Sequence, residues 1–238
     1  FGQEYNSIFG GYLWFFYKIL RRLVGSMIFR KGKFLFFSNL VMLVKNKFIL
    51  KKQRQNFFVL FVEANPKILR KKIYSQVESI SCLALGGKQN SKLGDLFFVD
   101  GDETGQGSSI FTKKGNINAN HSIAVNIVSP EYFANHIKEK YLKDNNDYKI
   151  ILRINCEGSE DEVIYAFKKI FGEKFSDVFG SLKDVKGVKG EQAYQNLIEF
   201  MKRSKIKFTD FSSSVISWPI AFDRMNTIVK QLKVKSRS

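Results

Sequence analysis

Acidic side chains directly after a hydrophobic run are the residues of this chain best placed to do chemistry. The run Asp95–Asp100 (DLFFVD) predicts a buried strand, and Asp102 and Glu103 follow it at once. Carboxylate oxygens are the ligands that divalent cations such as Mg²⁺ and Ca²⁺ prefer. The glycine-rich stretch 101–107 is no Walker A loop, because it lacks the Lys-Ser/Thr pair. The alternative interpretation is an acidic turn that binds no ligand.

The segment Asp100-Gly-Asp102-Glu-Thr104 resembles the first motif of haloacid-dehalogenase-type phosphohydrolases. That resemblance implies a phosphoryl-accepting nucleophile at Asp100, a general acid at Asp102 and a bound Mg²⁺. Ser129, after the apolar run 122–128, resembles the second motif of the same family. The first motif nevertheless lies at mid-chain, and no acidic pair follows at a later strand end. A Mg-dependent phosphohydrolase is therefore kept as the alternative hypothesis.

Residues that bind softer metals are scarce. The chain has two cysteines, Cys82 and Cys156, and two histidines, His121 and His136, all far apart in the sequence. These spacings fit neither a disulfide framework nor a cysteine-based zinc site. We therefore expect no metal and no other cofactor.

The charge of the chain is large and uneven. The net charge is +17 in 238 residues. Residues 1–75 carry 15 Lys and Arg against 2 acids, whereas residues 76–177 carry 12 against 15 and residues 178–238 carry 12 against 5. An excess of this size attracts polyanions, of which RNA, DNA and anionic membranes are the usual ones.

Basic residues cluster at both ends of the chain, and the first cluster is interleaved with the aromatic run 14–17. Such cations can neutralise phosphates, and aromatic faces can stack on unpaired bases or pack on a neighbouring protein. The alternative is an ordinary solvated surface, although the near absence of acids removes the ion pairs that such a surface usually has. The candidate rRNA-binding residues are Lys18, Arg21, Arg22, Arg30, Lys31, Lys33, Lys45, Lys47, Lys51, Lys52, Arg54, Lys67, Arg70, Lys71, Lys72, Lys233, Lys235 and Arg237.

No segment predicts a membrane span. The aromatic stretch Ile8–Phe29 contains Lys18, Arg21 and Arg22 at its centre, where charges are costly in lipid. A basic protein that binds a membrane surface through this stretch remains a further alternative.

The order of elements predicts an α/β fold with a mostly parallel sheet flanked by helices, in a three-layer arrangement. Apolar runs at 57–62, 80–85, 95–100, 122–128 and 149–154 predict strands, and those at 57–62 and 95–100 are expected to be buried on both faces. Helices are expected from Leu40, from Pro66 to about Val77, from Ser159 to about Phe171 and from Glu191 to about Ser204.

The amino-acid composition along the sequence suggests three parts. Residues 1–28 form a basic aromatic segment, residues 29–172 the α/β core, and residues 173–238 a basic C-terminal extension. Gly180, Gly187 and Gly190 punctuate the start of this extension, and Lys230 to Arg237 is expected to be a basic tail, mobile or lying along RNA.

The order of several segments resembles the small-subunit ribosomal protein two family. Three successive features are similar to the start of that family: the segment Phe29-Arg-Lys-Gly-Lys-Phe-Leu-Phe, the expected helix after Asn39-Leu40, and the run FFVLFVEANPK. Leu85-Gly86-Gly87-Lys88-Gln89-Asn90 is similar to its L-G-G-T-x-T-N segment, and Gly158-Ser-Glu-Asp-Glu162 to its G-N-D-D-A turn. Asp95–Asp100 and Ser122–Ser129 match two of its strands. The long helical hairpin of the family and the Trp before L-G-G are missing here.

This resemblance implies a structural protein of the small ribosomal subunit that binds rRNA and neighbouring ribosomal proteins and has no small-molecule substrate and no catalytic activity. The Lys-rich, Ala-poor composition of the chain is associated with AT-rich coding, which is common in organellar genomes. We therefore expect a divergent mitochondrial member, located on the mitochondrial ribosome in the matrix.

Overall fold

The computed structural model describes residues 57–70, 77–101, 105, 107–210 and 217–235. The chain divides into two compact units, one of residues Gln55–Ser217 and one of Phe1–Arg54 with Trp218–Ser238. Of the second unit the structure describes a single helix, α8 (Ser217–Lys235), whose first residue is assigned to the larger unit. The predicted boundary between residues 28 and 29 lies outside the described residues.

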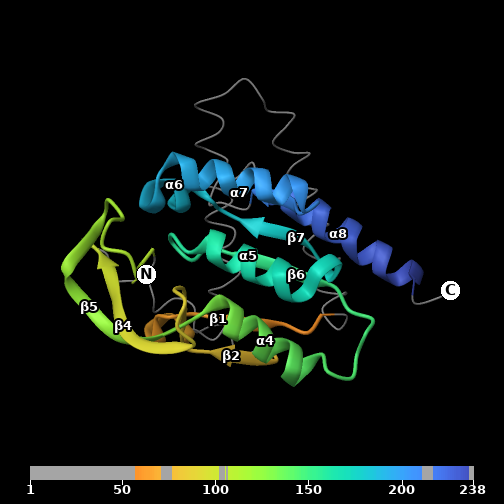
Figure 1. Ribbon diagram of the computed structural model, residues 1–238, viewed down its shortest axis with the longest axis horizontal. Helices are drawn as coiled ribbons and strands as arrows, with labels where there is room; N and C mark the ends of the chain where they lie inside the picture. The colour runs from red at the N-terminus through yellow and green to blue at the C-terminus, as the bar shows by residue number, and fades with distance from the viewer. Residues whose placement is uncertain (1–56, 71–76, 102–104, 106, 211–216, 236–238) are drawn as a thin grey trace, which may run out of the picture. The chain divides into compact units, whose positions relative to one another are not determined.

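The larger unit contains three sheets, and all of their described ladders except one are parallel (Figure 1). The predicted α/β class with mainly parallel sheets flanked by helices is therefore confirmed. Strand β1 (Leu60–Val62) pairs with β2 (Ser79–Ser81), β5 (Ile117–Val128) lies between β3 (Ala84–Leu85) and β4 (Ser91–Val99), and β7 (Phe175–Gly180) lies between β6 (Ile150–Ile154) and β8 (Lys207–Asp210).

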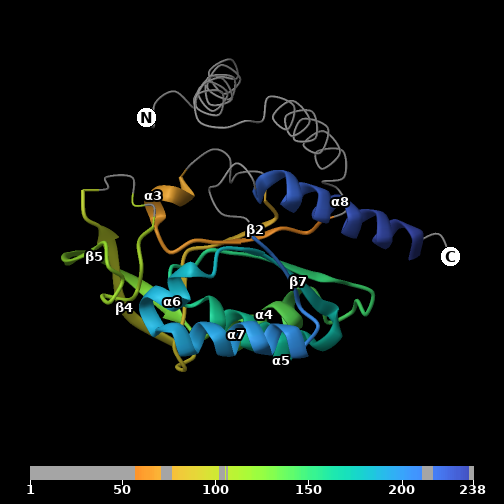
Figure 2. The same cartoon turned by 90° about the horizontal axis from the view of Figure 1, so that it is seen from above.

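The main helices of this unit cover one face of the strands (Figure 2). Helices α4, α5 and α7 lie on that face and form one of the two helical layers that a three-layer α/β fold places against its strands, so the structure is compatible with that fold. The helices are α3 (Pro66–Leu69), α4 (Pro130–Tyr141), α5 (Glu160–Phe171), α6 (Lys183–Lys189) and α7 (Glu191–Arg203), and a 3₁₀ turn (Gly172–Lys174) follows α5.

Local sequence signals explain where these helices begin. Asn65 caps α3 by accepting a hydrogen bond from the Lys67 amide, and Pro66 occupies the first turn as predicted. Ser129 caps α4 in the same way, again with a proline next to it. Helix α5 starts at Glu160, as expected from the acids in its first turn.

The core joins residues from both sides of position 172. Ile164 of α5, Phe175 and Val178 of β7, and Leu197 of α7 are completely buried in a single hydrophobic cluster. Because β7 is the central strand of its sheet, the expected extension 173–238 does not begin as a separate part at residue 173. The expected boundary is wrong: the α/β core continues through β8. The glycine-rich texture misled the prediction, since Gly180 is needed where β7 approaches β6, and a Cβ there would lie 1.9 Å from the carbonyl oxygen of Ile154.

Strand β4 also differs from expectation. The run Asp95–Asp100 was expected to be a strand buried on both faces, but it belongs to the longer strand β4, which pairs antiparallel with β5. Burial alternates along it: Leu96 and Phe98 are buried, whereas Asp95 is exposed and Phe97 is partly exposed. An antiparallel sheet with one covered face has this alternation. The run 80–85 is likewise divided between β2 and β3.

The C-terminal residues are helical up to Lys235, so Lys230, Lys233 and Lys235 of the expected basic tail belong to helix α8. Arg237 lies outside the described residues.

Candidate nucleic-acid interface

Most of the predicted rRNA-binding residues lie outside the part of the chain that the structure describes. Lys67 and Arg70 are described with their side chains, and Lys233 and Lys235 through the backbone of α8. The predicted residues outside the described part are Lys18, Arg21, Arg22, Arg30, Lys31, Lys33, Lys45, Lys47, Lys51, Lys52, Arg54, Lys71, Lys72 and Arg237.

Helix α3 exposes the two described cations of its cluster. Lys67 and Arg70 are both exposed, and the Lys67 ammonium lies 5.9 Å from the centre of the Phe98 ring. Asn65 holds the start of this helix through its buried side chain, whose amide donates to the Gly105 carbonyl at 3.2 Å. Both cations therefore stand on an anchored turn and are accessible to a phosphate.

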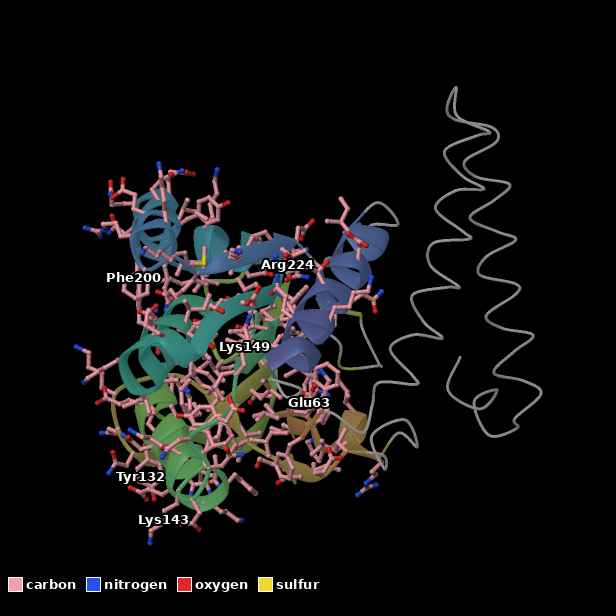
Figure 3. All side chains as sticks on the ribbon, turned by 90° about the vertical axis from the view of Figure 1, so that its right-hand side faces the viewer. Glu63, Tyr132, Lys143, Lys149, Phe200 and Arg224 are labelled. Atoms are coloured by element: carbon pink, nitrogen blue, oxygen red, sulfur yellow. The ribbon has the colours of Figure 1, made fainter. Side chains whose placement is uncertain are left out.

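Many other cations of the larger unit are paired with its own carboxylates. Lys149, which is labelled in Figure 3, contacts the buried Asp177 at 2.7 Å, and Lys189 contacts both Asp161 and Glu162 at 2.6 Å. The remaining pairs are Lys114–Glu157, Lys168–Glu173, Lys169–Glu131 and Lys186–Glu191. The charges at these positions are satisfied within the fold and attract a polyanion only weakly.

The loops after β3 and β6 come together at the carboxyl edge of the strands. The Ser159 hydroxyl donates to the Leu85 carbonyl at 2.7 Å, and the Gly87 amide donates to Glu162 Oε2 at 2.6 Å. The structure thus joins the two segments, 85–90 and 158–162, that are similar to L-G-G-T-x-T-N and G-N-D-D-A. We call the segments 85–87, 109–114 and 156–162, together with Lys189, the loop cluster.

Glu160 is the buried centre of the loop cluster. Its side chain is fully buried and accepts hydrogen bonds from the amides of Cys156 at 2.8 Å and Gly158 at 2.9 Å. Burial raises the pKa of Glu160 to about 7, and the nearby Asp184 adds to this effect, whereas the backbone hydrogen bonds oppose it. Burial, and then the charge of Glu160, also raise the pKa of the Cys156 thiol, so this thiol is not a reactive nucleophile.

Further contacts of the loop cluster lie outside the carboxyl ends of the strands, where open α/β sheets usually bind small ligands. The Ser109 hydroxyl donates to the Glu157 carbonyl at 2.7 Å, and Lys114 forms an ion pair with the Glu157 side chain at 2.5 Å. The Lys189 ammonium lies 5.4 Å from the centre of the Phe111 ring. These contacts join the segments of the loop cluster to one another, and an open hollow of about 410 Å³ lies beside Phe111 and Lys189.

The carboxylates of the phosphohydrolase hypothesis are not brought together with its second motif. Asp100 follows Val99, which pairs with Ile117, whereas Ser129 follows Val128, which pairs with Ser91. The two positions lie at opposite ends of β4, about 27 Å apart at the usual rise of a strand. Asp102 and Glu103 lie outside the described residues. In the part of the chain that is described, no group of three or more Asp, Glu, His or Cys residues is placed to hold a metal.

A set of four cations in the larger unit escaped the sequence prediction. Lys202, Arg203, Lys205 and Lys207 connect the end of α7 to the start of β8, and all four are exposed. We call these four residues the basic turn. The signal in the sequence was the absence of any acid from Phe200 to Thr209, which was not visible in a charge count taken over all of residues 178–238.

Comparisons with known proteins add no identification. No family model matches the chain, and neither a curated protein nor a solved structure matches it. None of the described helices is long and apolar enough to cross a membrane.

Proposed function

We propose that this chain is a structural protein of the mitochondrial small ribosomal subunit, which binds rRNA and neighbouring ribosomal proteins without catalysing a reaction. The observation that carries the proposal is the separation of charge along the chain. Residues 1–56 contain 11 Lys and Arg and a single acid, whereas residues 57–210 contain 23 and 20. A nearly neutral α/β scaffold is thus joined to a segment with a large surplus of cations.

This separation favours a phosphate-rich partner. Acids within residues 1–56 are too few to neutralise its cations, so the counter-charge has to come from another part of the chain or from a partner. In the larger unit, ion pairs such as Lys149–Asp177 already occupy many of the carboxylates. RNA supplies the missing counter-charge and gains affinity when the cations release its counterions.

The resemblance to the ribosomal family supports the same proposal. Two of the segments that carry the resemblance, 85–90 and 158–162, are in contact in the loop cluster through Ser159 and Gly87. The contact supports a common structural role for these segments, as expected if the resemblance reflects a shared core.

Exposed apolar side chains on the larger unit support contacts with neighbouring proteins. Leu93 of β4 is 74% exposed, and Phe58, next to β1, is 57% exposed. Single exposed apolar residues are normal, but a strand edge that carries one is also a surface to which a second protein can add.

The test is the sedimentation of the native protein. In a gentle lysate that contains Mg²⁺, we expect the protein to co-sediment with small-subunit rRNA. A variant with Lys45, Lys47, Lys51 and Lys52 changed to Gln should shift toward the free pool, and its small subunits should assemble poorly.

The matched control removes four cations that the fold pairs internally. Changing Lys114, Lys168, Lys169 and Lys186 to Gln alters the net charge equally but should leave most of the protein on the subunit. A wild-type protein found solely in a free pool, or in a particle without small-subunit rRNA, would contradict the proposal.

A further inference from the structure

The basic turn is a cationic surface within the α/β unit itself. We propose that Lys202, Arg203, Lys205 and Lys207 bind the phosphodiester backbone of RNA. This inference rests on the proposed function and extends it, since it places an RNA contact on the unit whose charge is otherwise nearly balanced.

The cations of the basic turn form no ion pair with any residue that the structure describes. No acid occurs from Phe200 to Thr209, and within the described part of the chain none of the four forms an ion pair. The charge of Lys205 does lower the pKa of Glu173, but the contact of Glu173 with Lys168 lowers it more. In the same unit, the exposed Lys169 and Lys186 do have carboxylate partners. The basic turn therefore retains charge that other surfaces of the fold neutralise.

The backbone holds the basic turn in a fixed conformation. The Lys205 amide donates to the Lys202 carbonyl at 3.2 Å, and the Ile206 amide donates to the Met201 carbonyl at 2.8 Å. Together with a left-handed residue at position 205, this pattern is a Schellman motif at the end of α7. Met201 and Ile206 are both buried in the main core cluster, so the turn is anchored on each side. A preorganised set of cations loses less entropy on binding than a flexible one.

Lys205 occupies a position that favours glycine. Its φ is +55°, in the left-handed region where a side chain is strained, and helices usually place a glycine there. Residues held in such conformations cluster at functional sites. A lysine here adds a cation at a conformational cost, as expected if the charge has a use. The helix dipole accounts for cations in the last turn of α7, such as Lys202 and Arg203, but not for Lys207, which starts strand β8.

The surroundings of the basic turn favour RNA over a membrane surface. Met201 and Ile206 are buried, so these apolar neighbours cannot insert into a lipid bilayer. Cations can bind the phosphate groups of an RNA strand without any apolar contact, and the basic turn supplies four cations.

The experiment compares two triple variants of the full-length chain. The first changes Lys202 to Gln, Lys205 to Gly and Lys207 to Gln. It keeps Arg203, whose charge lowers the pKa of Tyr165 against the larger effect of burial. The control changes Lys138, Lys140 and Lys143 to Gln; these residues lie at and just after the end of α4, close to Glu139 and Asp144 in the sequence, and Lys143 is on the outer surface (Figure 3). Binding to a fluorescein-labelled RNA hairpin is measured across a KCl series.

We expect the basic-turn variant to bind the hairpin at least about tenfold more weakly at about 0.1 M KCl, with a log–log salt slope smaller in magnitude by about 2. The control should change both quantities much less. Equal losses in the two variants, or no loss in either, would overturn the inference but leave the proposed function intact. Failure of the wild-type chain to bind RNA would overturn both. Loss of binding to vesicles of phosphatidylserine and phosphatidylcholine, with RNA binding unchanged, would show that the turn serves a membrane instead.

Discussion

The loop cluster and the basic turn lie at opposite edges of the sheet formed by β6, β7 and β8, and they differ in whether their cations are paired. All three strands are parallel, so the loop cluster lies at their carboxyl edge and the basic turn at their amino edge. At the carboxyl edge, Lys189 is shared by Asp161 and Glu162, and its side chain is 20% exposed. At the amino edge, the four cations of the basic turn are exposed and form no ion pair with a described residue, although Lys149, which precedes β6 at the same edge, does pair with the buried Asp177.

This difference separates charges that hold the fold together from charges available to a partner. Partly buried pairs are screened weakly by salt, and losing one member leaves the other without a counter-charge. Exposed unpaired cations contribute little to folding but raise the local concentration of a polyanion. Mutations should therefore have different effects at the two places: stability should change in the loop cluster, and RNA affinity should change in the basic turn.

The largest effect is expected from the buried carboxyl of the loop cluster. Because the folded pKa of Glu160 is raised to about 7, above its ordinary value of 4.5, the unfolded chain releases this proton first as the pH rises. Glu160 therefore stabilises the fold fully below about pH 4.5, and this contribution, up to about 3 kcal/mol, is lost as the pH rises to about 7 and beyond.

Urea unfolding of the wild type and of Glu160→Gln at about pH 5 and about pH 8 checks this. The decrease in the free energy of unfolding between the two pH values should be smaller in the variant. An identical decrease in both proteins would show that Glu160 does not titrate in this range.

A somewhat smaller loss is expected when Lys189 is changed to Met. The substitution leaves Asp161 and Glu162 without their counter-charge, and their side chains are only 12% and 31% exposed. We expect the free energy of unfolding to fall by about 2 kcal/mol, with no change in RNA affinity. Thermal unfolding and hairpin binding, measured on the same preparation, test both halves. Weaker RNA binding by the folded variant would remove the contrast between the edges.

Changing Lys205 to Gly should increase the free energy of unfolding instead of lowering it. Glycine adopts the left-handed conformation without strain, so we expect a gain in stability of about 1 kcal/mol. The same variant removes a cation from the basic turn and should bind RNA more weakly. A protein that is more stable yet binds less separates the two effects, because unfolding cannot explain the loss. A stabilised variant with unaltered affinity would exclude Lys205 from the contact.

The smallest effect is expected for an exposed pair. The Lys169 and Glu131 side chains are 64% and 48% exposed, and surface pairs of this kind are worth little. Lys169→Gln should change the free energy of unfolding by less than about 0.5 kcal/mol and leave RNA affinity nearly unaltered. A chemical-denaturation curve that shifts well beyond this would mean that this pair, which joins α4 to α5, is a structural element of the fold.

Several features of the fold were predictable because their signals are local. The apolar run 57–62 and Pro66 after it indicated a strand and a helix start, and the acids at 160–162 indicated the first turn of α5; the structure contains β1, α3 and α5 there. The predicted boundary at 172/173 was wrong. It rested on local glycine and lysine content, which does not indicate which strand lies at the centre of a sheet. The antiparallel pairing of β4 was missed for the same reason.

By itself, the sequence determined the α/β class, the large cationic surplus of residues 1–56 and the positions of several helix starts, since periodicity, composition and capping act over a few residues. Only the tertiary structure decided which charges are neutralised. Lys189 and Lys205 lie 16 residues apart on similar basic segments, but Lys189 contacts two carboxylates of α5, whereas Lys205 forms no ion pair with a described residue. Coulombic attraction depends on distance in space, and the fold sets that distance through contacts between residues that are remote in the chain.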